Sequence, residues 1–285
     1  MNTLNTTIAA YKGGVIDRRT FLDCLIALTG SMAAAHLLLE STGLASTMIS
    51  QIESKQKEIS SDTVTYTASD GESIGAYLST PRERERFPGV IVIHENRGLN
   101  DHIRDVARRF AAEGFTALAP DLLSRMGGTG SMASPDKARE ALSSLSPDEA
   151  IADLKAGLEY LDHHDRVIRG RLGSTGFCWG GLRSFVLAAE SQLLRAAVVF
   201  YGSAPPADTL AQVQCPVLGL YGETDERITS QVPEVAEEMK RHDKHFEYKI
   251  YPGAGHAFFN DTGGRYNPDA AKDAWRRTIE FLQTT

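Results

Sequence analysis

Three residues whose types suit acyl transfer occur in order along the chain, each after an apolar run. Cys178 stands in Gly176-Phe177-Cys178-Trp179-Gly180, which fits a G-x-nucleophile-x-G pattern with cysteine where serine is more usual. Asp225 and His256 each follow a later apolar run and lie near glycines. Attack on a carbonyl needs a nucleophile, a base and a carboxylate that orients the base. The sequence therefore predicts a triad of Cys178, Asp225 and His256.

The glycines around Cys178 predict a sharp turn from a strand into a helix, because a side chain on such a strained turn needs neighbours without a Cβ. At a helix N-terminus, free N–H groups and the helix dipole are expected to favour the thiolate of Cys178. Alternatives stay open here: Cys178 as a buried structural cysteine, and Glu223 or Asp208 as the acid in place of Asp225.

Apolar runs alternate with amphipathic segments from residue 63 onward, and a β-hairpin is predicted at the Asp70-Gly71 turn. This alternation predicts right-handed βαβ units, hence an α/β fold with a mostly parallel central sheet and helices on both faces. Ligands bind such sheets at the carboxyl ends of the strands. Buried strands are predicted at 89–95, 115–121, 171–177, 196–201, 217–221 and 246–251, and helices at 101–113, 136–144, 148–163, 233–242 and 269–282.

Residues 1–46 are predicted to form an N-terminal extension, in which Arg18-Arg19 precedes a weakly apolar run as in a twin-arginine export signal. Such a signal predicts a periplasmic or exported protein. Glu40 interrupts the run and no clean cleavage site follows, so an amphipathic helix that stays on a cytoplasmic protein is the alternative. The run is too short and broken for a stable membrane span. A polar linker is predicted at 47–62 and the catalytic domain at 63–285.

The composition narrows the class of partner. With 285 residues and 42% hydrophobic residues, the chain can bury one substantial core. Its formal charge of −7 makes nucleic acid an unexpected partner. The 3 cysteines form no C-x-x-C or Cys/His cluster, so neither a disulfide framework nor a metal site is expected. We expect no cofactor, a small-molecule substrate, and a monomer or homodimer.

Four separated motifs stand out along the chain: Gly176-Phe177-Cys178-Trp179-Gly180-Gly181, His94-Glu95-Asn96-Arg97-Gly98-Leu99-Asn100, Pro120-Asp121-Leu122 and Gly253-Ala254-Gly255-His256-Ala257-Phe258. Together they resemble the dienelactone hydrolase family, the carboxymethylenebutenolidases. The resemblance runs from about Val64 to the C-terminus and implies an α/β-hydrolase fold in which Cys178, Asp225 and His256 form the triad. It also implies that the carboxylate of Glu95 interacts with the thiol and helps control its ionisation.

The resemblance implies hydrolysis of dienelactone, or of a related lactone or small carboxylate-bearing ester, through an acyl-enzyme on Cys178. Backbone N–H groups of Trp179 and Asn96 are expected to hold the oxyanion. A general carboxylesterase or thioesterase, or a catalytically silent binding protein of the same fold, are the alternatives.

In the family, two arginines hold the substrate carboxylate. One of them aligns with Arg125, whereas the other position is occupied by Asn260, so this chain departs from the pattern. Arg265 or Arg97 are candidate replacements, and the alternative for Arg125 is a solvated loop residue.

Overall fold

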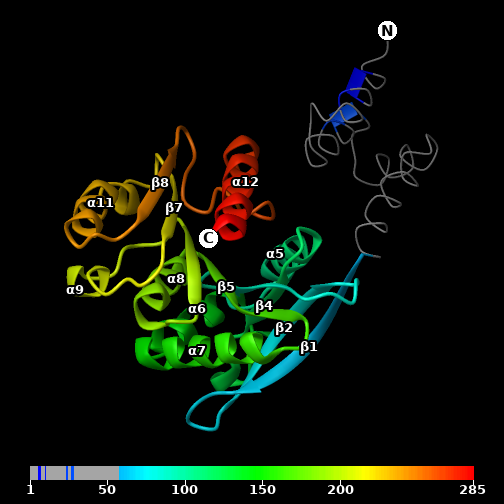
Figure 1. The fold of residues 1–285 in the computed structure, drawn as a ribbon. Coiled ribbons are helices and arrows are strands. Elements are labelled where there is room, and N and C mark those ends of the chain that lie inside the picture. Colours follow the sequence, from blue (N-terminus) through cyan, green and yellow to red (C-terminus); the bar gives the residue numbers. More distant parts are fainter. Residues whose placement is uncertain (1–5, 8–9, 11–23, 25–26, 29–57) are drawn as a thin grey trace. The chain divides into compact units, whose positions relative to one another are not determined.

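The computed structural model describes residues 6–7, 10, 24, 27–28 and 58–285, of which Glu58–Thr285 forms the compact unit that follows (Figure 1). Arg18-Arg19 and nearly all of the predicted extension and linker lie outside the described residues. The first strand starts at Ile59, so residues 59–62, which were expected in the linker, belong to the sheet. Within the described part of the chain, no helix is long and apolar enough to cross a membrane.

The eight strands form one sheet in the order β1-β2-β4-β3-β5-β6-β7-β8. The pairs β1–β2 and β2–β4 are antiparallel, and the other neighbouring strands are parallel, as predicted. The strands are β1 (Ile59–Thr67), β2 (Ser73–Pro81), β3 (Phe87–Ile93), β4 (Thr116–Pro120), β5 (Val167–Phe177), β6 (Leu194–Phe200), β7 (Val217–Gly222) and β8 (Phe246–Tyr251).

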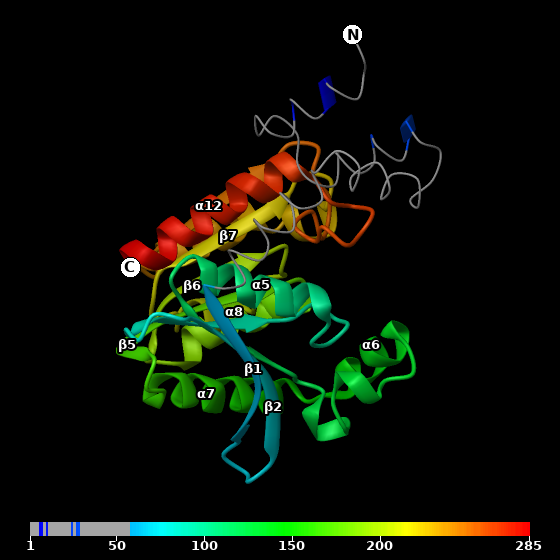
Figure 2. The ribbon, with the colours of Figure 1, turned by 90° about the vertical axis from the view of Figure 1, so that its right-hand side faces the viewer.

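Helices cover both faces of this sheet. Helices α5 (Asp101–Ala112) and α12 (Pro268–Thr284) lie on one face, with α7 (Pro147–His163) on the opposite face (Figure 2). Helices α8 (Trp179–Glu190) and α11 (Val232–Arg241) share the α7 side, because their buried residues belong to the same core layer. The shorter elements are η1 (Ser124–Met126), η2 (Thr129–Ser131), α6 (Pro135–Ser144), α9 (Ala207–Leu210) and α10 (Glu226–Thr229).

Strand β3 shows how the two layers fix the sheet. Val90 and Val92 pack in the layer of α5 and α12, whereas Ile91 and Ile93 pack in the layer of α7 and α8. Successive side chains of a strand point to opposite faces, so an apolar run is buried on both. All four side chains are fully buried, and each such burial contributes about 1.5–3 kcal/mol. The end of β3, and the loop that follows it, are therefore firmly placed.

Five parallel strands deliver polar residues to the same edge of the sheet. Glu95 follows β3, Cys178 follows β5, Tyr201 follows β6, Asp225 follows β7 and His256 follows β8. Because parallel strands end at a common edge, residues far apart in the sequence meet there.

Candidate active site

Cys178 occupies the predicted sharp turn between β5 and α8. Its backbone lies at φ 55° and ψ −112°, a conformation that non-glycine residues rarely adopt. A Cβ at Gly176 would lie 2.0 Å from the Gly180 carbonyl oxygen, and one at Gly180 would lie 2.5 Å from the His94 carbonyl oxygen. The glycines therefore allow the strand and helix to approach closely enough to push the Cys178 side chain outward.

The structure brings the three predicted triad residues into one hydrogen-bonded line. His256 Nε2 lies 3.0 Å from Cys178 Sγ, and His256 Nδ1 lies 2.5 Å from Asp225 Oδ2. A carboxylate beside Nδ1 places the ring proton there, so Nε2 accepts from the thiol. Glu223 instead accepts from the Gly253 N–H, and Asp208 lies in α9. Of the three candidate acids, Asp225 is the one on the histidine.

In the resting site, the neutral thiol of Cys178 is favoured over the thiolate. Burial and the charge of Glu95 raise its pKa to about 11, although the Trp179 N–H, the charge of Arg227 and the Asn96 N–H act in the opposite direction. The Trp179 N–H at the start of α8 and the Asn96 N–H thus act toward the thiolate, as expected. Loss of water and a nearby carboxylate outweigh the backbone N–H groups, so the neutral thiol donates to His256.

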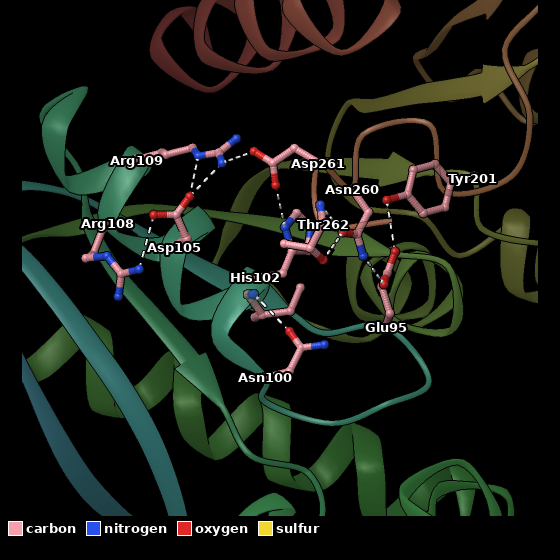
Figure 3. A network of polar contacts seen from close by, with 11 residues as sticks. Glu95, Asn100, His102, Asp105, Arg108, Arg109, Tyr201, Asn260, Asp261 and Thr262 are labelled. Carbon is pink, nitrogen blue, oxygen red and sulfur yellow. Dashed lines mark hydrogen bonds and ion pairs between the residues drawn. The ribbon is translucent and has the colours of Figure 1, made fainter. Parts of the chain in front are cut away.

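Glu95 lies buried beside the triad and is held by two neutral donors. The Tyr201 hydroxyl donates to Glu95 Oε1 at 3.1 Å, and Asn260 Nδ2 donates to Oε2 at 2.9 Å (Figure 3). The Glu95 residue is buried, and its charge raises the pKa of the Cys178 thiol. The structure thus places Glu95 where the resemblance implied.

Tyr201 is a site residue that the sequence did not indicate. It is fully buried, and its backbone lies at φ 40° at the end of β6. Its ring meets the His256 ring edge-on with centroids 5.2 Å apart, while its hydroxyl reaches Glu95. Ligands bind at the carboxyl ends of parallel strands, and Tyr201, like Asp225, follows such a strand. Because Tyr201 ends an apolar run, the sequence predicts that it belongs to the strand.

His94 fixes the loop after β3 against the nucleophile turn. Its Nδ1 lies 2.7 Å from the Glu95 carbonyl oxygen, to which it donates, and its Nε2 accepts from the Leu122 N–H at 3.3 Å. The ring stacks on Trp179 with centroids 5.6 Å apart. Complete burial lowers the pKa of His94, so the ring is neutral and serves to hold structure.

Cys178 and His256 line a pocket of about 320 Å³ that is rich in positive charge. Arg97, Arg139 and Arg265 contribute guanidinium groups, and among the described lining residues Glu95 is the only carboxylate. The pocket thus suits a small anionic ligand. Within the described residues, no group of three or more His, Cys, Asp or Glu side chains could hold a metal ion. The remaining lining residues are Asn96, Ala257, Asn260, Gly263 and Gly264.

Arg125 does not line this pocket, contrary to the expectation from the sequence. Its guanidinium donates to both carboxylate oxygens of Asp153, at 3.0 and 2.7 Å, and to Asp70 at 2.7 Å. Asp153 is fully buried on α7, and a buried carboxylate needs a paired cation. Arg125 therefore ties η1 to α7 and to the β1–β2 hairpin, and is not placed to hold a substrate carboxylate.

Comparisons with known proteins agree with this fold. The family model described as "Dienelactone hydrolase family" matches residues 74–285. A protein of Saccharolobus solfataricus, provisionally named a carboxymethylenebutenolidase, is 36% identical over 251 residues, covering 75% of this chain and 95% of the relative. A Bradyrhizobium protein, provisionally named a 2-oxo-3-(5-oxofuran-2-ylidene)propanoate lactonase, is 36% identical over 226 residues, covering 75% of this chain and 90% of the relative.

Solved structures show the same architecture. A crystal structure from Klebsiella pneumoniae, provisionally named a dienelactone hydrolase, superimposes with a TM-score of 0.74 at 32% identity, covering 80% of this chain and 99% of that one. Both the α/β-hydrolase fold and the family resemblance read from the motifs are thereby confirmed. The chain belongs to the dienelactone hydrolase family and is a hydrolase of the lactone and ester class.

Proposed function

We propose that this enzyme hydrolyses a lactone or small ester that carries a carboxylate, through an acyl-enzyme on Cys178. The observation that carries the proposal is the Cys178–His256–Asp225 line, whose first two members open on a pocket with three arginines. The name of the Bradyrhizobium relative describes such a substrate, a furanone ring bearing a propanoate group.

In the first half-reaction, Cys178 Sγ bonds to the substrate carbonyl carbon while its proton passes to His256 Nε2. Asp225 stabilises the resulting imidazolium. The carbonyl oxygen becomes an oxyanion beside the N–H groups of Trp179 and Asn96, which already point at the sulfur. Collapse breaks the bond to the ring oxygen, which leaves as an enolate and takes its proton from His256. A thioester on Cys178 remains.

In the second half-reaction, a water molecule gives a proton to His256 Nε2 while its oxygen bonds to the thioester carbon. Collapse of this intermediate releases the Cys178 sulfur, which regains the proton from His256. The product carries one new carboxyl group, and the site returns to its neutral resting state.

The pocket arginines are proposed to hold the substrate carboxylate. Asn260 occupies the position of a family arginine, but Arg97, Arg139 and Arg265 line the same pocket. Guanidinium groups bind carboxylates through paired hydrogen bonds. The departure at Asn260 therefore leaves the pocket with cations in other positions.

The test compares dienelactone with p-nitrophenyl acetate, an ester without a carboxylate. Cys178→Ser should abolish turnover of both. Arg97→Gln, Arg139→Gln and Arg265→Gln should together raise the KM for dienelactone about tenfold, with less than about twofold change for p-nitrophenyl acetate. Arg241→Gln on α11 is the matched control. Aryl-ester turnover without dienelactone turnover would indicate a general carboxylesterase or thioesterase instead, and no turnover of either would contradict the proposed substrate class.

A further inference from the structure

A continuous set of polar contacts joins Glu95 to helix α5 through the loop of residues 252–267, here the β8–α12 loop (Figure 3). Within that loop, Asn260 donates to Glu95, and the next residue, Asp261, faces α5. Asp261 Oδ1 lies 3.3 Å from His102 Nδ1, and Asp261 Oδ2 pairs with Arg109. Adjacent residues of one loop therefore contact the carboxylate of the site and a helix packed on the sheet.

The orientation of the Asn260 amide is set by its own loop. Asn260 Oδ1 accepts from the Thr262 N–H at 3.1 Å and from the Thr262 hydroxyl at 2.7 Å. An oxygen that faces two donors leaves the amide nitrogen to face Glu95 (Figure 3). Both ends of the amide are thus used within the protein. Asn260 lines the pocket, yet its polar atoms are committed to Glu95 and Thr262 rather than to a substrate.

Asp261 contacts α5 chiefly through its ion pair with Arg109, while His102 Nδ1 lies within ion-pair distance without forming a hydrogen bond. The His102 side chain is almost fully buried, and Arg109 is shared between Asp261 on the loop and Asp105 on α5 (Figure 3). Partial burial alone would raise the pKa of Asp261, but His102 and Arg109 outweigh it and hold that pKa well below its usual range. Asp261 is therefore charged at neutral pH and bonded to a helix that does not belong to its loop.

We propose that Asp261 is a positioning residue, which anchors the β8–α12 loop to α5 and thereby holds Asn260 against Glu95, fixing the carboxylate beside the Cys178 thiol. The inference deepens the proposed function, because it names what sets the geometry of the group that controls the nucleophile. The charged and titratable groups that act on Cys178 are Glu95, His256, Arg227, Arg183 and Tyr201.

The effect of the Glu95 carboxylate on the Cys178 thiol weakens as the distance between them grows. While Asn260 and Tyr201 hold Glu95, its carboxylate opposes ionisation of Cys178. Once Asp261 no longer fixes the loop, the hydrogen bond from Asn260 is lost for part of the time, and the carboxylate is then free to leave its position beside the thiol. The pKa of the thiol then falls, although no residue in contact with Cys178 has been changed.

The experiment measures the rate of Cys178 alkylation by iodoacetamide against pH, read from the labelled peptide by mass spectrometry. Asp261→Asn and Asn260→Ala should each raise the rate constant at pH 8 about threefold, which is half a pKa unit. Because Asp261 acts through Asn260, the double variant should show no more than the Asn260→Ala effect. Asp105→Asn, which removes the other carboxylate partner of Arg109, is the matched control and should leave the rate unchanged.

Additive effects in the double variant, an unchanged thiol pKa in Asp261→Asn, or an equal shift in Asp105→Asn would each overturn the proposal. If Asp261→Asn fails to fold, His102→Gln removes one of the two anchors and should shift the rate in the same direction by a smaller amount. Alkylation needs no substrate, so these outcomes stay separate from the identity of the lactone or ester.

Discussion

At the scale of single residues, the site is governed by the environment of one thiol. Cys178 has a histidine on one side, which can accept its proton, and a carboxylate, Glu95, nearby, whose charge disfavours ionisation of the thiol. The neutral thiol is favoured at rest, so in the proposed mechanism ionisation is coupled to proton transfer onto His256 during attack.

Replacing Glu95 by glutamine tests this account. The pKa of Cys178, raised to about 11 in part by Glu95, should fall when the charge is removed. Because the thiolate is the reactive form, alkylation by iodoacetamide at pH 8 should become about tenfold faster, and its rise with pH should move to lower pH. Lactone turnover should nevertheless fall. Glu223→Gln, which alters a carboxylate bonded to the Gly253 N–H, serves as control. An unchanged alkylation profile in Glu95→Gln would disprove the electrostatic role.

At the scale of elements, ion pairs join segments that are distant in sequence. Arg125 connects η1 to Asp153 on α7 and to Asp70 in the β1–β2 hairpin. Burial raises the pKa of Asp153, and the Arg125 guanidinium opposes that rise. The bidentate pair satisfies a carboxylate that has no access to water. It is therefore a structural contact away from the pocket.

We expect Arg125→Met to destabilise the protein without affecting substrate binding. Leaving the carboxylate of Asp153 buried and unpaired should cost about 3–5 kcal/mol, which corresponds to a fall in Tm of about 10 °C. The KM for dienelactone should not change. Arg139→Met should give the opposite pattern, a raised KM with little change in Tm, since Arg139 is an exposed lining residue. Thermal melts and steady-state kinetics on both variants distinguish a structural role of Arg125 from a role in substrate binding. A raised KM in Arg125→Met would show that Arg125 does bind the substrate.

At the scale of the whole molecule, the catalytic unit is delimited by its first strand. Strand β1 pairs with β2 along its full length, starting from Ile59 opposite Pro81. Ile59 is buried, and its carbonyl oxygen accepts from Arg82 Nε at 2.8 Å. The unit that begins at Glu58 therefore includes residues that the polar composition had assigned to a linker.

Two shortened chains test this boundary. The chain 58–285 should keep the Tm of the parent within about 2 °C and its kcat/KM within about twofold, because it retains all the strands that the structure describes. The chain 63–285 loses the buried side chain of Ile59 and the first pairs of β1, so its Tm should be about 5 °C lower. Equal melting of the two shortened chains would show that residues 58–62 contribute nothing.

The sequence by itself determined which residues could meet. The G-x-C-x-G pattern around Cys178 predicted a strand-to-helix turn, and the alternation of apolar runs with amphipathic segments predicted a parallel sheet. Since parallel strands end at one edge, the order of Cys178, Asp225 and His256 along the chain was enough to predict their convergence. These are local patterns, set by the backbone preferences of neighbouring residues and by the two-sided burial of strands.

The tertiary structure decided how the residues that meet are charged and paired. Arg125 pairs with Asp153, and Tyr201 turns its hydroxyl to Glu95, through contacts that no spacing in the sequence encodes. The thiol of Cys178 stays protonated because burial and a carboxylate from another loop outweigh the helix N-terminus. Desolvation and charge pairing depend on distances between segments in space, so they become definite only once the chain has folded.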